Sequence, residues 1–119
     1  PYVQYTYARA KSVLRKYGKT VDFDQVDCNA LADNVSYNLV KILSGYEEAV
    51  KNAAEKYEPS VVARYIMNLA AAFNKFYHDC AILKAEETVK QARLALTELT
   101  QRVLYDGCRL LGLECPEEM

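Results

Sequence analysis

The stretch 59-PSVVARYIMNLAAAFNKFYHDC-80 decides the fold, because its large apolar residues recur every three or four positions. That spacing places them on one face of an α-helix, and Pro59 suits the first helical position because its missing N–H is not needed there. The predicted stripe consists of Val62, Ile66, Leu69, Phe73, Phe76 and Cys80. We therefore expect a long helix that faces a core.

The helical period continues upstream of this stretch. A first helix is predicted from the chain start to Gly18, a residue suited to the left-handed helix stop, with a stripe at Val3, Ala10, Val13, Leu14 and Tyr17. The segment 18–29, GKTVDFDQVDCN, is predicted to be an irregular connection. A second helix follows with Asn29 as its cap and a stripe at Ala32, Val35, Leu39, Ile42 and Leu43.

Two further helices complete the prediction. Ser44 and Glu47 have the spacing of a capping box, so we expect a break there and a new helix over Tyr46, Val50, Ala53 and Tyr57. After a linker over 83–87, the last helix is predicted to end at Gly112 and to bury Val89, Ala92, Leu96, Leu99, Val103 and Leu110. Gly107 lies inside that pattern, which suggests a close approach to another helix or a bend.

Length and composition bound the class of protein. The chain has 119 residues, 51% of them hydrophobic and 26% charged, with a net charge of −1. These values are typical of one globular domain, and no apolar run approaches the length needed to cross a bilayer. We predict a single all-α domain over 1–119, a bundle of about five helices without membrane contact. Because the chain starts at Pro1, we interpret it as a fragment of a longer protein.

The cysteines and acidic residues do not indicate a catalytic or metal site. Cys28, Cys80, Cys108 and Cys115 form no CxxC pair and have no histidine at metal-ligand spacing, so no metal is expected. Free cysteines at apolar positions favour a reducing compartment, which suggests a cytoplasmic protein. The only histidine, His78, has no partner at a spacing that would form a catalytic dyad, so no catalytic residue is predicted.

The first helix carries groups suited to recognition of RNA. Tyr5 and Arg9 are four residues apart and would point the same way, with Gln4 beside them. A phenol ring next to a guanidinium suits stacking on a nucleobase and hydrogen bonding to its edge. On the long helix, Asn74, Lys75, Tyr77 and His78 lie around the polar side, and Tyr77 offers another ring. The alternative is a solvated amphipathic helix whose tyrosines pack against the core.

Three blocks together resemble a known family. The opening YVQYTYARAKSVLRK, the stretch 59–80 and the closing ARLALTELTQRVLYDGCRLLGLECPEEM are similar to the C-terminal anticodon-binding domain of arginyl-tRNA synthetases, named for an Asp-Ala-Leu-Arg signature. The family pattern Leu-Gly-x-x-x-Pro-Glu-x-Met at the end is met by Leu111, Gly112, Pro116, Glu117 and Met119. The resemblance covers nearly the whole chain. Tyr7 stands where the family often has histidine.

The resemblance implies a site and a partner. It places Tyr5, Arg9 and Met119 in a pocket for an anticodon base, with Tyr77 near the loop and Gln4 and Asn74 beside them. Phosphate contacts are expected from Arg15, Lys16 and Lys19. The expected partners are the anticodon arm of an arginine-accepting tRNA and the parent's own catalytic domain. This fragment is expected to hold no cofactor, whereas ATP and arginine would bind the parent enzyme elsewhere.

Other functions remain open at this point. The main alternative is a helical protein-interaction bundle without RNA binding, in which the long helix and the ten tyrosines serve a protein partner. A related helical module occurs in cysteinyl-tRNA synthetases, but the terminal Leu-Gly and Met pattern argues against that family. An autonomous enzyme is the weakest alternative, because the chain offers very few reactive groups that could converge on a substrate. The HIGH and KMSKS-type signatures of the synthetase catalytic domain are also not present in this sequence.

Overall fold

The computed structural model describes residues 2–116, and these form five α-helices with no strand among them. The helices are α1 (Tyr2–Tyr17), α2 (Asn34–Ser44), α3 (Tyr46–Lys56), α4 (Ser60–Asp79) and α5 (Glu87–Leu110). Two short 3₁₀ turns, Phe23–Gln25 and Cys28–Leu31, connect α1 to α2. The predicted all-α bundle is confirmed, and no helix in the described part is long and apolar enough to span a membrane.

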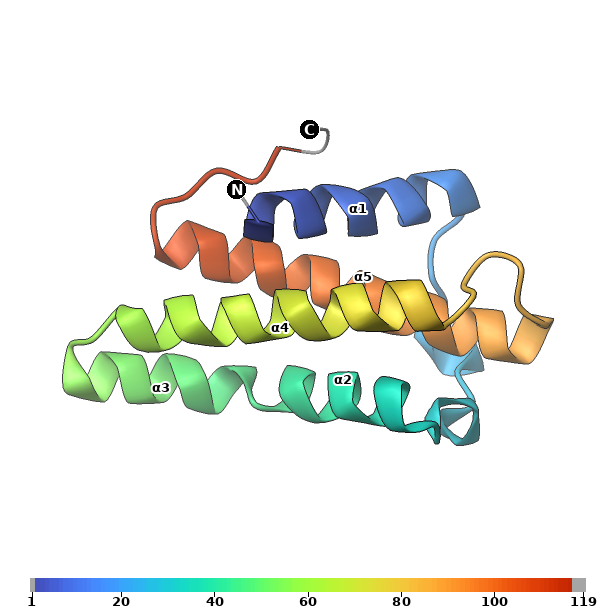
Figure 1. Ribbon diagram of the computed structural model, residues 1–119, viewed down its shortest axis with the longest axis horizontal. Helices are drawn as coiled ribbons and strands as arrows, with labels where there is room; N and C mark the ends of the chain where they lie inside the picture. Colours follow the sequence, from blue (N-terminus) through green and yellow to red (C-terminus); the bar gives the residue numbers. More distant parts are fainter. Residues whose placement is uncertain (1, 117–119) are drawn as a thin grey trace.

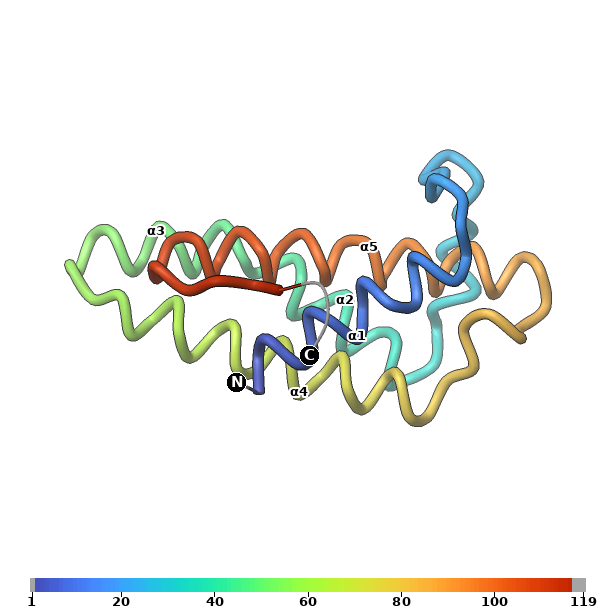
Figure 2. Tube along the Cα trace, turned by 90° about the horizontal axis from the view of Figure 1, so that it is seen from above, coloured from blue at the N-terminus to red at the C-terminus, as the bar shows by residue number. Residues whose placement is uncertain are grey.

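Helices α4 and α5 run antiparallel through the middle of the molecule (Figure 1). On one side α2 and α3 follow each other along almost one line and cover α4, while α1 lies on the other side and contacts both α4 and α5. The view from above shows that the end of α1, the loop after α4 and the start of α5 gather at one end of the bundle (Figure 2). Helix α1 packs along α4, and we call the contact between these two helices the seam.

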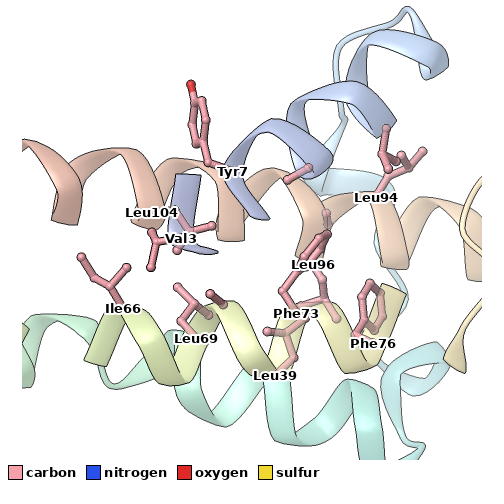
Figure 3. Packing of buried hydrophobic residues seen from close by; sticks show 14 of the residues in the cluster. Val3, Tyr7, Leu39, Ile66, Leu69, Phe73, Phe76, Leu94, Leu96 and Leu104 are labelled. Carbon is pink, nitrogen blue, oxygen red and sulfur yellow. The ribbon is translucent and has the colours of Figure 1, made fainter. Parts of the chain in front are cut away.

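The core lies where α1, α2, α4 and α5 meet (Figure 3). Every member of the stripe predicted for the long helix is buried, and Phe73, Phe76 and Leu69 are fully so. In α1, Val3, Ala10 and Val13 are buried as predicted, but Thr6 and Tyr7 are buried as well. The described cysteines are free, with Cys80 and Cys108 in the core.

Glycines and one proline mark the helix ends close to where the sequence placed them. Gly18 and Gly112 have φ values of +74° and +73°, the left-handed conformation that glycine adopts without strain. Helix α4 begins at Ser60, one residue later than predicted. Pro59 has helical backbone angles, but it is the N-cap residue and not the first residue of the helix. At Gly107, an added Cβ would lie 2.2 Å from Cδ1 of Ile66, so the predicted close approach of two helices is confirmed.

Two cap predictions were wrong. Asn29 lies inside a 3₁₀ turn, and Asp33 caps α2 instead, with its carboxylate accepting from the Ser36 amide at 3.0 Å. The capping box at Ser44 does not form, because Ser44 ends α2 and its hydroxyl donates to the Lys41 carbonyl at 2.7 Å. The break between the two helices is nevertheless present at Gly45.

The predicted stripe of the last helix was wrong in part. Ala92 and Leu96 are buried, but Leu99 and Leu110 are exposed, while Leu94, Leu104 and Cys108 are fully buried or nearly so; Val89 and Val103 are half-buried. The reason is that α5 packs against α1, α2 and α4 at once, so its buried surface is wide and not a single stripe.

The Asp33 cap gives a prediction about pH. Partial burial raises the pKa of Asp33, but the hydrogen bond from the Ser36 amide and the charge of Arg93 lower it, and the net pKa is below its ordinary value. Because the pKa of Asp33 is lower in the folded than in the unfolded protein, its carboxylate stabilises the fold at every pH above its unfolded-state pKa. This contribution is lost as the pH falls through the folded-state pKa. We expect the stability advantage of the native protein over Asp33→Asn, measured by urea unfolding, to shrink between about pH 5 and about pH 2.

An unchanged advantage over that range would contradict this assignment. Asparagine is the suitable replacement because it also caps helices but does not titrate.

Candidate nucleic-acid interface

The first element of the candidate site is the solvent-facing side of α1. Tyr5 is 58% exposed, Gln4 and Arg9 are half-buried, and all three lie within the first turns of the helix. The alternative that the tyrosines of α1 pack against the core holds for Tyr7 but not for Tyr5. Tyr5 therefore presents a ring that a ligand can reach.

Helix α4 supplies the second element. The guanidinium of Arg9 donates from Nη1 to Oδ1 of Asn74 at 2.9 Å, and its Cζ lies 4.5 Å from the centre of the Tyr77 ring. Arg9 and Asn74 are 65 residues apart in sequence, so packing of α1 on α4 brings the predicted groups together. The guanidinium is thus held at its edge by an amide and at its face by a phenol.

Two residues that the sequence analysis missed complete this network. The Nδ2 group of Asn74 donates to the Tyr2 hydroxyl and to Oγ1 of Thr6, each at 2.9 Å, and the Thr6 hydroxyl donates to the Tyr2 carbonyl at 2.9 Å. Tyr2, Thr6 and Arg9 are four and three residues apart, the spacing of one helix face. That spacing was a signal for a polar seam facing another helix.

A small hollow lies beside Tyr77 at the end of α4. It has a volume of about 280 Å³ and is lined by Val13 and Lys16 of α1, Tyr77 of α4, and Cys80, Ala81, Ile82, Leu83 and Lys84, which follow α4. Its floor is apolar and two lysines border it. Burial raises the pKa of the Cys80 thiol above its ordinary value, although the charge of Arg93 opposes this.

The remaining predicted residues take the following places. Arg15 and Lys16 are exposed in the last turn of α1, and Lys19 is exposed just after Gly18. Met119 lies outside the described residues. His78 is exposed with its ring edge-on to Tyr77, at 5.7 Å between centroids. Within residues 2–116, no group of three or more His, Cys, Asp and Glu side chains could hold a metal ion.

The glutamates at helix starts act as structural charges. Glu86 caps α5, accepting from the amides of Thr88 at 2.9 Å and Val89 at 3.4 Å. These bonds lower its pKa from the ordinary value. Glu87, Glu47 and Glu48 lie in the first turns of α5 and α3, where a negative charge is favourable.

Comparison with known proteins gives consistent matches. The family model described as the DALR anticodon binding domain matches residues 3–119. An arginine-tRNA ligase of Enterococcus faecalis is 52% identical over 119 residues, and one of Alkaliphilus metalliredigens is 44% identical, each covering 100% of this chain and 21% of the relative. The chain therefore spans about a fifth of the length of the curated relatives it matches.

Solved structures agree with the sequence matches. The arginyl-tRNA synthetase of Thermus thermophilus superposes with a TM-score of 0.91 at 39% identity, covering 100% of this chain and 21% of that one. A putative arginyl-tRNA synthetase from Campylobacter jejuni gives a TM-score of 0.86 at 25% identity, covering 99% of this chain and 26% of that one.

Proposed function

This chain belongs to the family of DALR anticodon-binding domains, and from that premise we propose that it recognises the anticodon arm of arginine-accepting tRNA. The observation that supports this function best is the Arg9 guanidinium, held by Asn74 and stacked on Tyr77 beside the exposed Tyr5. The relatives are named as arginine-tRNA ligases, which favours this function over a protein-interaction bundle.

The chemistry of the seam fits one base in particular. Every arginine anticodon has cytosine at its middle position, and the Watson–Crick edge of cytosine offers acceptors at O2 and N3. The planar fork of Arg9 can donate to that edge, and an exposed phenol can cover the face of the unstacked base. We assign these roles to Arg9 and Tyr5, with Tyr77 supporting Arg9 and Gln4 at the border, and we place Met119 as the residue that closes the pocket.

Exposed cations on the same helix would bind the backbone. Arg15, Lys16 and Lys19 lie at the end of α1, past Arg9 in the direction of the hollow beside Tyr77. Lysine and arginine neutralise phosphates without reading sequence. The affinity for RNA should therefore fall as the salt concentration rises, so the affinities of the native protein and its variants have to be measured at the same ionic strength.

The wider activity is proposed for a longer protein that contains this domain. In it, a separate catalytic domain would bind ATP and arginine and attach arginine to the tRNA, while this domain would hold the anticodon arm. Such a protein would work in the cytoplasm, where translation takes place. Free cysteines such as those of this chain are common in that reducing compartment.

The test uses a short RNA hairpin with the anticodon-loop sequence of an arginine tRNA. Loss of one stacking ring costs about 1–3 kcal/mol, so Tyr5→Ala should weaken binding roughly 5- to 150-fold. A hairpin with uracil in the middle position should bind the native protein more weakly, because its N3–H is a donor that faces the donors of Arg9. Fluorescence titration at fixed salt measures both effects.

Tyr37→Ala is the matched control. Tyr37 lies on α2, away from the seam, and is 57% exposed against 58% for Tyr5, so its loss removes a ring of equal exposure. Its affinity for the hairpin should stay native. Equal binding of the cytosine and uracil hairpins, together with native affinity of Tyr5→Ala, would refute the proposed pocket. Binding of a protein partner and no RNA would favour the interaction bundle.

A further inference from the structure

We propose that Asn74 is a positioning residue, which holds the Arg9 guanidinium in the orientation that reads the base and does not itself contact RNA. The inference rests on the proposed function and assigns a different role to one of the residues expected to bind the anticodon. It starts from the position of the Asn74 carboxamide, which lies between α1 and α4 with contacts to three side chains of α1.

The orientation of this carboxamide follows from its partners. A guanidinium can only donate, so Arg9 must face the amide oxygen. The single hydroxyl hydrogen of Thr6 is directed at the Tyr2 carbonyl, so Thr6 can only accept from Asn74 and must face the amide nitrogen. The flipped amide would place donor against donor and acceptor against acceptor, and one arrangement is therefore selected.

The hydrogen bonds of the Asn74 carboxamide leave it few groups that could contact a base. An amide has two N–H donors, and both are used, on the Tyr2 hydroxyl and on Thr6. Its oxygen accepts from Arg9 and retains one lone pair. Asn74 therefore has no free donor for the acceptors O2 and N3 of cytosine, whereas Arg9 has further N–H groups for that edge, so Asn74 suits support of Arg9 better than reading of this edge.

Support of Arg9 has a definite consequence for binding. A free arginine side chain has many rotamers, and ordering it on binding reduces affinity. Here the hydrogen bond to Asn74 fixes the edge of the fork, and the Tyr77 ring at 4.5 Å fixes its face. The Asn74 amide is neutral, so it does not compensate the positive charge of Arg9. A carboxylate at the same position would compensate that charge.

A double-mutant cycle tests the proposal. Asn74→Ala should weaken binding of the cytosine hairpin about tenfold and reduce its preference over the uracil hairpin, since Arg9 is no longer pre-organised. In the Arg9→Ala background, the same Asn74→Ala change should alter affinity less than about twofold, because the group it acts through is gone. Equal losses in both backgrounds would mean that Asn74 contacts RNA directly and would overturn the proposal.

A second variant and a second measurement distinguish loss of the Arg9 orientation from misfolding of Asn74→Ala. Thr6→Val keeps the shape of a buried side chain but removes the acceptor that orients Asn74, and it should reduce the base preference with Arg9 and Asn74 both present. In the free protein, NMR should show restricted rotation of the Arg9 guanidinium, and this should be lost in Asn74→Ala. Free rotation in the native protein would overturn the inference without touching the proposed function, which the Tyr5 experiment tests separately.

Discussion

Replacing Phe73 by alanine is expected to lower the free energy of unfolding by about 3–5 kcal/mol, the range for truncation of a fully buried aromatic ring. Phe73 has no exposed surface and belongs to the core that α1, α2, α4 and α5 form together (Figure 3). Its ring is 5.9 Å from that of Phe76 and 6.4 Å from that of Tyr77, so its loss leaves a cavity that these neighbours fill only in part. Urea unfolding with an unchanged m-value measures the effect.

Met67→Ala provides the comparison on the same helix. Met67 is 48% exposed, so the change should stay within about 0.5 kcal/mol of native stability. A similar loss for both variants would mean that burial of Phe73 is not the cause of the effect, because alanine has the highest helix propensity and neither change weakens α4 in that way.

The strongly periodic parts of the fold could be predicted from the sequence. Every residue of the stripe from Val62 to Cys80, along α4 and its C-cap, is buried, because apolar residues that recur with a 3.6-residue period over 20 residues can only lie on one face of a helix. Gly18 and Gly112 end their helices because few other residues adopt a positive φ. These features depend on local chemistry alone.

Caps and the face of α5 depend on more than local chemistry. The connection before α2 offers four aspartates, and which of them caps the helix is decided by where the 3₁₀ turns end, so Asn29 was the wrong choice and Asp33 the right one. The exposed positions of Leu99 and Leu110 follow from the three helices that surround α5. A single apolar stripe is expected of a helix that packs against one neighbour. For α5, which has three neighbouring helices, this expectation misplaced the centre of the buried surface.

The candidate site shows the same division. The sequence could place Tyr5 and Arg9 on one helix and Asn74 and Tyr77 on another, because each pair is local. It could not show that Arg9 is bonded to Asn74 and stacked on Tyr77, since that depends on how α1 lies across α4. The pocket itself and the part assigned to Met119 stay predictions.

Gly107→Val is expected to lower the free energy of unfolding by about 3 kcal/mol, the upper end of the usual cost of overpacking. The Cβ position of Gly107 is 2.2 Å from Cδ1 and 2.8 Å from Cγ1 of Ile66, which is itself buried, so the side chain of Ile66 must move in a close-packed core. A β-branched residue adds two methyl groups to this contact. Thermal and urea unfolding measure the loss.

The cause can be separated from a general effect of valine in a helix by changing Ile66 as well. Ile66→Val alone should cost about 0.5–1.5 kcal/mol, because it removes one buried methyl group. In that background the cost of Gly107→Val should fall by at least about 1 kcal/mol, since the atom nearest to the new side chain is gone. Additive losses would show that the two helices adjust elsewhere, and that the contact between Gly107 and Ile66 does not set the distance between α4 and α5.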